Sequence, residues 1–371
     1  MIHKVTNLLK EIVKNKTKFF FRPPRSYKYL IFDKSGSQYF NDILTSNDTC
    51  ILNTRFESLN LYIIGKCILN LDMSLLKYFS NYIQCVNPKF VITFIDNRIL
   101  FYQLKKNIEN KNIKFISVQN GCRRNKNDMG EHLHLYHNLS SDYYFVWGNN
   151  IVQELSKYIK TKFIPIGSFK NNKIPILKSK KKRIINFISQ FRIDNLWNTY
   201  GEEYFIENKI LSKIHDYCIK NDFIFQILCT TNTESEVDFY NKYLTKKTNL
   251  IFSKRRSTFD NYKKLDEASL NIFIDSAMGY ESIARGNKTL AVSLRLFNEE
   301  SSFKFGWPNY ETYKNKIYVV NSEDINFIDN KIDQILNLRN NEWEKEVKNF
   351  NQIMKFDYDN TIFKDEIRKL L

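Results

Sequence analysis

Polar residues follow a short apolar and β-prone run, residues 271–274, late in the chain. Such a run is typical of a buried parallel strand, and open α/β sheets bind ligands at the carboxyl ends of their strands. Ser276 can cap a helix that begins near Gly279, where free backbone amides and a missing side chain suit a phosphate. Glu281 could accept hydrogen bonds from ribose hydroxyls. The alternative is an ordinary serine-capped turn. The nucleotide-binding candidates here are Asp275, Ser276, Gly279, Tyr280 and Glu281.

Two polar strand ends in the first half of the chain offer a second candidate site. Asp96 and Asn97 end the apolar run 90–95, where a carboxylate can act as base or nucleophile, or can cap the next helix. Gln119 and Asn120 end the next run in the same way, although Asn-Gly is also a common hairpin turn. Polar residues at the ends of neighbouring strands favour a site over two unrelated turns.

The elements that must position these residues follow an alternating pattern of apolar runs and helical stretches, which predicts doubly wound parallel sheets, two of them for the whole chain. In the first half the expected strands are Tyr27–Phe32, Leu61–Ile64, Phe90–Ile95, Ile113–Val118, Tyr143–Trp147 and Phe163–Ile166. In the second half they are Arg183–Ile188, Phe223–Leu228, Leu250–Phe252, Leu270–Ile274, Thr289–Leu294 and Ile317–Val320. The expected helices include Arg98–Asn110, Asn150–Lys160, Glu203–Lys220 and Asp260–Glu267.

Composition limits the class of protein. The 371 residues suggest about two domains, and 16 Gly and Pro residues in total exclude fibrous and low-complexity classes. A net charge of +17 implies an anionic partner, which could be nucleic acid, a phosphorylated substrate or an acidic membrane face. A polar and basic stretch, residues 170–183, separates the two halves.

The cysteines and histidines do not indicate a metal site. None of the six cysteines forms a C-x-x-C pair, so we expect reduced thiols and a cytoplasmic protein. His132 and His134, with Cys122 upstream, match no common metal-binding spacing, and we expect no metal. No window approaches the roughly 20 apolar residues of a membrane span.

The N-terminus carries a basic amphipathic pattern. Apolar residues recur at helical spacing in residues 2–13, between lysines, and an aromatic cluster with arginines follows in residues 19–25. Such a segment could lie in a membrane interface beside anionic lipid, or its apolar stripe could pack on the first domain.

A set of short motifs between residues 94 and 308 points to a known family. They are Phe94-Ile-Asp-Asn97, Val118-Gln-Asn-Gly121, Val146-Trp-Gly148, Pro165-Ile-Gly-Ser168 with Asn171-Asn172, Asp275-Ser276 with Gly279-Tyr-Glu281 and Arg285-Gly286, and Phe305-Gly-Trp-Pro308. Together they resemble bacterial surface-carbohydrate glycosyltransferases of GT-B architecture, which build lipopolysaccharide or capsule. Within this group the chain is similar to the retaining β-Kdo transferases that use CMP-Kdo.

The resemblance implies two Rossmann-like domains that face each other. The acceptor glycan would bind in an N-terminal domain, residues 1–170, and the nucleotide-sugar donor in a C-terminal domain, residues 184–355. Residues 171–183 would form the linker, and a C-terminal helix in 356–371 would cross back to the first domain. The partners implied are a CMP-linked donor, a glycan or lipid-linked acceptor and the anionic inner face of the plasma membrane, with no nucleic acid.

The resemblance also suggests roles for individual residues. Asp96 is the first candidate for an essential carboxylate and Asp194 the second, with Gln119 and Asn120 orienting donor or acceptor. The nucleotide sugar would also meet the end of the first strand of the second domain, where Arg192 could neutralise phosphate without a metal. The residues there are Ser189, Gln190 and Arg192, and the candidates for an acceptor or donor carboxylate are Asn97, Arg123 and Arg124.

Two other classes remain open. A polyol-phosphate transferase with a CDP-linked donor would share the architecture and the nucleotide turn, but it would transfer phosphorus. A nucleic-acid-binding protein would also explain the charge, although the basic residues are dispersed and no recognised nucleic-acid-binding motif occurs.

Overall fold

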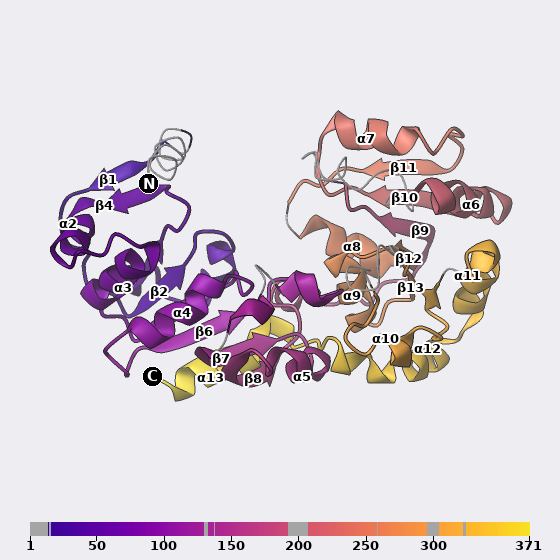
Figure 1. The fold of residues 1–371 in the computed structure, drawn as a ribbon. Coiled ribbons are helices and arrows are strands. Elements are labelled where there is room, and N and C mark those ends of the chain that lie inside the picture. The colour runs from indigo at the N-terminus through magenta and orange to yellow at the C-terminus, as the bar shows by residue number, and fades with distance from the viewer. Residues whose placement is uncertain are drawn as a thin grey trace.

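Two six-stranded parallel sheets organise the computed structural model (Figure 1). The structure describes residues 14, 16–129, 133–136, 138–191, 207–257, 259–294, 304–321 and 324–371. Within these residues every strand pairing is parallel. The α/β class with two parallel sheets, predicted from the sequence, is confirmed.

The first sheet has the order β3-β2-β5-β6-β7-β8. Its strands are β2 (Tyr29–Phe32), β3 (Thr49–Leu52), β5 (Phe90–Thr93), β6 (Lys114–Val118), β7 (Leu139–Val146) and β8 (Ile159–Pro165). The helices of this half are α2 (Leu61–Leu69), α3 (Leu75–Val86), α4 (Ile99–Asn107) and α5 (Val152–Leu155). β2 and β5 are buried along their whole length, as expected for strands with both faces covered.

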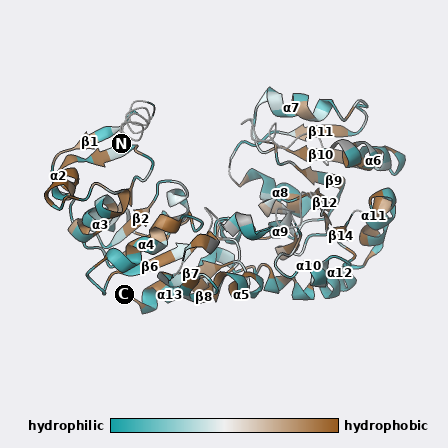
Figure 2. Ribbon diagram, viewed as in Figure 1, coloured by the Kyte–Doolittle hydropathy of each residue, from teal (hydrophilic) through white to brown (hydrophobic). Residues whose placement is uncertain are grey.

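The second sheet has the order β11-β10-β9-β12-β13-β14. Its strands are β9 (Lys182–Ile188), β10 (Ile224–Leu228), β11 (Leu250–Ser253), β12 (Ala268–Phe273), β13 (Thr289–Val292) and β14 (Val319–Val320). The helices that follow Lys182 are α6 (Glu207–Lys220), α7 (Glu234–Asn241), α8 (Asp260–Glu267), α9 (Ala277–Ala284), α10 (Tyr310–Tyr313), α11 (Ile328–Asn337), α12 (Asn340–Glu346) and α13 (Thr361–Lys369). Hydropathy colouring shows brown, hydrophobic strands beside teal, hydrophilic helix faces (Figure 2).

Three expectations about local structure were wrong. Leu61–Ile64 begins helix α2 instead of forming a strand, because the Asn60 side chain caps the helix by accepting from the Ile63 amide at 3.1 Å. A run of four apolar residues does not by its period distinguish a strand from a helix. In the stretch 150–160 the α-helix covers only Val152–Leu155, and β8 begins at Ile159. Two sheets were expected for the whole chain, but a third, two-stranded sheet pairs β1 (Lys18–Phe20) with β4 (Ser58–Asn60).

The C-terminal segment returns to the first sheet. Phe363 of α13 packs 4.7 Å from Phe145 and 5.0 Å from Phe169, measured between ring centroids. On the way, the amide of Lys355 donates to the backbone oxygen of Trp147 at 2.9 Å. Gly167 allows this crossing, because a Cβ at that position would lie 2.1 Å from the Lys355 oxygen. The crossing therefore contributes to fixing how the two sheets face each other.

Candidate functional site

The carboxyl ends of β6 and β12 meet between the two sheets. Arg124, in the loop after β6, places its Nη1 3.2 Å from Oδ2 of Asp275, just after β12. The Cys122 thiol donates to the backbone oxygen of Asp275 at 3.6 Å. The amide of Lys304 donates to the backbone oxygen of Arg124 at 3.0 Å. Since ligands of α/β proteins bind at this edge of a sheet, the junction is the candidate site.

Asp96 lies beside this junction as a buried member of an ion pair. Its Oδ2 accepts from Arg123 Nη2 at 2.5 Å and from the hydroxyl of Tyr144, and its Oδ1 accepts from the Asn120 amide at 3.1 Å. Burial and then the charge of Asp96 raise the pKa of Tyr144 well above its ordinary value, so the phenol stays protonated and donates. These contacts make Asp96 the anchor of the loop that carries Arg123 and Arg124. Its catalytic role stays a prediction.

Gln119 and Asn120 differ in what their side chains do. Gln119 is buried, where its Nε2 donates to the Gly121 oxygen at 2.8 Å and its Oε1 accepts from the Trp147 amide at 2.9 Å. Asn120 is half-buried and uses its backbone amide to hold Asp96. Asn97 is half-buried in the turn after β5. Gln119 therefore shapes the loop, and Asn120 and Asn97 are better placed to meet a ligand.

Arg123 is buried and fully engaged. Besides Asp96, its Nη1 donates to the backbone oxygens of Gly121 at 3.2 Å and Cys122 at 3.3 Å. Burial opposes its charge, but the charge of Asp96 outweighs that effect, so the pKa of Arg123 lies above its ordinary value. Arg123 thus acts inside the loop, and Arg124 is the arginine that reaches the second domain.

The end of β9 contributes Ser189 and Gln190. Ser189 is buried and donates from its Oγ to Glu236 at 2.5 Å. Gln190 is half-buried, and within the described residues its buried Oε1 has no hydrogen-bond partner. Arg192 and Asp194 lie outside the residues that the structure describes.

The turn after β12 differs from expectation in one respect. Ser276 caps α9 by accepting from the Met278 amide at 3.3 Å, as predicted. Gly279, expected to let a phosphate approach, instead makes room for its own strand, because a Cβ there would lie 2.0 Å from the ring of Phe273. The need for glycine at 279 is therefore explained by packing inside the second domain.

Tyr280 and Glu281 are buried and already have protein partners. Tyr280 accepts from the Gly306 amide at 3.3 Å. Glu281 accepts from Ser168 Oγ at 2.5 Å and from the Tyr262 hydroxyl at 2.8 Å, which links the two domains. Ribose binding by Glu281 stays a prediction, and it would require a ligand to reach a carboxylate that is 1% exposed.

The geometry brings together the side chains that follow β9 and β12. The two strands are neighbours, with Phe187 paired to Ile272, so Gln190 and Ser276 lie at the same edge of the sheet. Arg124 reaches this edge from the first domain through Asp275. The site thus combines half-buried amide and hydroxyl groups with an arginine, a set suited to an anionic, hydrogen-bonding ligand.

Two buried carboxylates near strand ends, Glu236 in the first turn of α7 and Asp33 after β2, were not predicted. Glu236 accepts from Ser189, from the amides of Thr230 at 2.9 Å and Thr231 at 2.8 Å, and so joins the ends of β9 and β10. Its signal in the sequence is the capping pattern Thr233-x-x-Glu236. Asp33 follows β2 as Asp96 follows β5, and accepts from Thr54 at 2.7 Å and Arg98 at 3.1 Å.

The described residues contain no cluster of three or more His, Cys, Asp or Glu side chains that could hold a metal ion. His132, which with His134 was considered as a metal ligand, lies outside the described residues. No helix in the described ranges is both long enough and apolar enough to cross a membrane.

Residues 116–371 match the profile of a family described as O-antigen biosynthesis proteins. No curated protein sequence matches the chain. The matched range includes every site residue named here except those of the β2 and β5 ends.

Solved structures share the fold. The chain is similar to UDP-GlcNAc 2-epimerase from Neisseria meningitidis bound to UDP-GlcNAc, with a TM-score of 0.55, 12% identity and coverage of 95% of this chain and 100% of that one. It is also similar to sucrose-phosphate synthase from Thermosynechococcus elongatus, with a TM-score of 0.50, 11% identity and coverage of 100% and 93%. The chain is similar as well to the wall teichoic acid polymerase TagF, with a TM-score of 0.50, 10% identity and coverage of 94% of this chain and 89% of that one. These similarities establish GT-B architecture.

Proposed function

The chain belongs to this family named for O-antigen biosynthesis, and from that premise we propose that it is a glycosyltransferase of surface-polysaccharide assembly. It would move a sugar from a nucleotide-activated donor onto a glycan or a lipid-linked acceptor. The observation that carries the proposal is the family match over residues 116–371, joined to a GT-B fold in which two sheets meet at their carboxyl ends. That edge is where such sheets bind nucleotides.

The donor proposed is CMP-linked Kdo or a related ulosonic acid, transferred with retention. Support for an anionic donor comes from the net charge of +17 and from Arg124 at the junction. Arg124 would turn from Asp275 to a donor phosphate or carboxylate, since a guanidinium binds either group in a bidentate manner. Gln190 and Ser276 would supply hydrogen bonds beside it. No metal is needed in this scheme.

The carboxylate that acts on the sugar is proposed to be Asp96 or Asp194. The contacts of Asp96 with Arg123 and Tyr144 support a positioning role for it, because both of these donors occupy the same oxygen. If Asp96 acts as nucleophile through Oδ2, that oxygen must first lose these partners, whereas Oδ1 accepts from the Asn120 amide. Asn120 would orient the donor or the acceptor, and the acceptor would approach from the first domain, at the cytoplasmic face of the plasma membrane.

The test is a transfer assay with product analysis. The purified protein would be incubated with CMP-Kdo, CDP-glycerol, UDP-GlcNAc and GDP-mannose in turn, with lipid-linked glycans as acceptors. The masses of the products would be measured by mass spectrometry. Glycosyl transfer adds a sugar without phosphorus, whereas transfer from a CDP-polyol leaves a phosphate on the acceptor. A phosphorus-containing product would replace the proposal by the polyol-phosphate alternative. Binding to nucleic acid without any transfer would contradict both.

A further inference from the structure

Exposed apolar side chains gather at one end of the first domain. Among the described residues, ten of the eighteen exposed large hydrophobic side chains lie between residues 19 and 75. The eight that belong to two short segments, here called the apolar tip, are Phe19, Phe20 and Phe21, and Ile68, Leu69, Leu71, Met73 and Leu75. Leu71 is 94% exposed and Leu69 is 85% exposed. An apolar concentration of this kind on a protein surface marks an interaction site.

The two segments of the tip belong to connected elements at one end of the first domain. β1, which holds Phe19 and Phe20, pairs with β4, and α2 begins directly after β4. In Figure 1 β1, β4 and α2 form the end of the first domain that points away from the second. Figure 2 shows brown, hydrophobic residues on α2 at this end. The tip is therefore remote from the junction of Arg124 and Asp275.

The turn after α2, which exposes Leu71, is held by two hydrogen bonds. The amide of Asp72 donates to the Cys67 oxygen at 3.0 Å, and the amide of Ser74 donates to Asp72 Oδ1 at 2.9 Å. Leu71 has a φ of 51°, in the left-handed region that costs a leucine free energy. Exposure and an unfavourable backbone conformation at one leucine fit a residue kept for contact with something outside the chain.

The first segment of the tip lies in a basic stretch, and the second contains one exposed acidic residue, Asp72, between Lys66 and Lys77. Residues 14–25 contain Lys14, Lys16, Lys18, Arg22 and Arg25 and no acidic residue. Lys18, Arg22 and Arg25 are exposed. Apolar side chains ringed by lysine and arginine are the composition of surfaces that bind anionic lipid. Charge complementarity of this kind, beside exposed apolar side chains, favours an anionic bilayer as the occupant.

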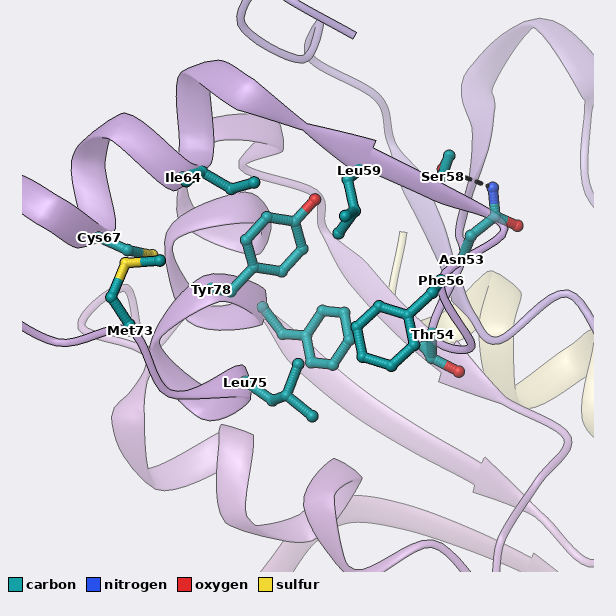
Figure 3. Close-up of a pocket in the computed structure, with 11 residues that line it drawn as sticks. Asn53, Thr54, Phe56, Ser58, Leu59, Ile64, Cys67, Met73, Leu75 and Tyr78 are labelled. Atoms are coloured by element: carbon teal, nitrogen blue, oxygen red, sulfur yellow. Dashed lines mark hydrogen bonds between the residues drawn. The ribbon is translucent and has the colours of Figure 1, made fainter. Parts of the chain in front are cut away.

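An apolar pocket opens beside the tip (Figure 3). Its volume is about 100 Å³, and Leu59, Ile64 and Phe79 line it. Met73 and Leu75 belong both to the tip and to the pocket wall. The exposed apolar surface thus continues into the domain, where it offers room for a short piece of hydrocarbon chain.

We propose that the apolar tip docks the first domain on an anionic lipid bilayer. Leu69 and Leu71 enter the hydrocarbon region, Lys18, Arg22 and Arg25 meet the headgroups, and one hydrocarbon chain reaches the pocket between Met73 and Leu75. This surface deepens the proposed function and rests on it only for the membrane-borne acceptor. The apolar tip is then the part of the chain that brings the acceptor domain to the membrane.

The experiment is co-sedimentation of the full chain with vesicles of phosphatidylcholine alone or with roughly 30 mol% phosphatidylglycerol, an anionic surface near which each Lys or Arg adds about 1 kcal/mol of binding. We expect binding to the anionic vesicles only. The double substitution Leu69→Ser, Leu71→Ser should weaken it about 100-fold, because each leucine loses its burial in hydrocarbon. Arg22→Gln with Arg25→Gln should weaken it about 25-fold. The control Ile251→Ser, Phe327→Ser, at exposed positions of the second domain, should leave binding unchanged.

Three outcomes would overturn the docking surface. They are no binding to either vesicle, equal binding by the Leu69→Ser, Leu71→Ser variant, and loss of binding only when the N-terminal segment is changed by Leu8→Ser and Leu9→Ser. The proposed function is checked separately on the same variants by the rise in melting temperature that a nucleotide causes without vesicles. Docking is supported if a variant loses vesicle binding but its melting temperature still rises with the nucleotide. If the wild type binds vesicles but its melting temperature does not respond to any nucleotide, only the proposed function is contradicted.

Discussion

Arg124 and Asp275 join the two sheets through a contact of 3.2 Å between Nη1 and Oδ2. The other side of the guanidinium is held by Asp128, with Nε 2.7 Å from Oδ2 and Nη2 3.1 Å from Oδ1. Arg124 therefore stands between one carboxylate of its own loop and one of the opposite domain. An anionic ligand at the junction could replace Asp275 without disturbing the bidentate pair with Asp128.

Arg124→Met is expected to lower the free energy of unfolding by about 2–4 kcal/mol, because it leaves two largely buried carboxylates without their cation. Arg368→Met removes an arginine from an exposed ion pair and should change it by about 0.5 kcal/mol or less. Urea unfolding at pH 7 measures both. Equal decreases in the free energy of unfolding would show that the Arg124 contacts at the junction do not stabilise the fold more than an exposed ion pair does.

Asp96→Asn tests whether this carboxylate holds the loop after β6. Its loss leaves Arg123 buried without a counter-charge, so we expect a decrease of about 3–5 kcal/mol in the free energy of unfolding. Tyr144→Phe removes one hydrogen bond to the same carboxylate and should cost about 1–2 kcal/mol. A side chain that only attacks substrate would leave stability unchanged on substitution, and that result in urea unfolding would remove the positioning role.

Gly167→Ala tests the crossing of the C-terminal segment. Gly167 and Gly286 have nearly the same φ, 82° and 83°, so alanine costs each about 1–2 kcal/mol of backbone strain. Only at Gly167 does the new Cβ meet another segment, the Lys355 oxygen at 2.1 Å, and this adds about 1–3 kcal/mol. Gly286 has open space around it. Similar melting temperatures for the two variants would show that the crossing contributes little.

Cys122 reports on the closed junction. Burial raises the pKa of its thiol to about 11, so almost no thiolate is present at pH 8. Alkylation of Cys122 by iodoacetamide at pH 8 should be about two orders of magnitude slower than in the urea-unfolded chain, whose thiol has an ordinary pKa of about 8.5. The rate should then rise about tenfold per pH unit between pH 8 and 10. Peptide mass spectrometry gives the rate, and a folded-state rate at pH 8 close to the unfolded one would contradict a buried thiol.

Much of the fold could be predicted from apolar periodicity. Residues 90–93 and 185–188 are buried and mostly apolar, as expected for strands of a parallel sheet that is covered on both faces. Leu61–Ile64 was misassigned because what decides its state is the cap at Asn60, a contact that periodicity does not describe.

The site was harder to predict, because the sequence locates polar strand ends without saying what each side chain binds. Ser276 follows its local rule and caps α9. The contacts of Glu281 could not be predicted from its neighbours in the sequence, because its partner Ser168 lies in the other domain and only the folded chain brings them together. Gly279 was linked to a ligand, but the ring it accommodates belongs to Phe273, whose packing depends on the sheet.

We propose that a nucleotide binds where β9 and β12 end, and a thermal-shift panel with CMP, CDP, UDP, GDP and ADP is the experiment to perform first. Ser276→Ala and Ser74→Ala form a matched pair, because each removes the side-chain cap of one helix, at a cost of about 1 kcal/mol, and only Ser276 lies at the junction. A nucleotide at about 100 times its Kd stabilises the folded state by about 2.7 kcal/mol. We expect CMP to raise the melting temperature of the wild type and of Ser74→Ala, and to raise that of Ser276→Ala much less. A shift with UDP or GDP in place of CMP would keep a nucleotide site and remove the CMP-linked donor, whereas no shift with any nucleotide, or an undiminished shift in Ser276→Ala, would contradict the claim.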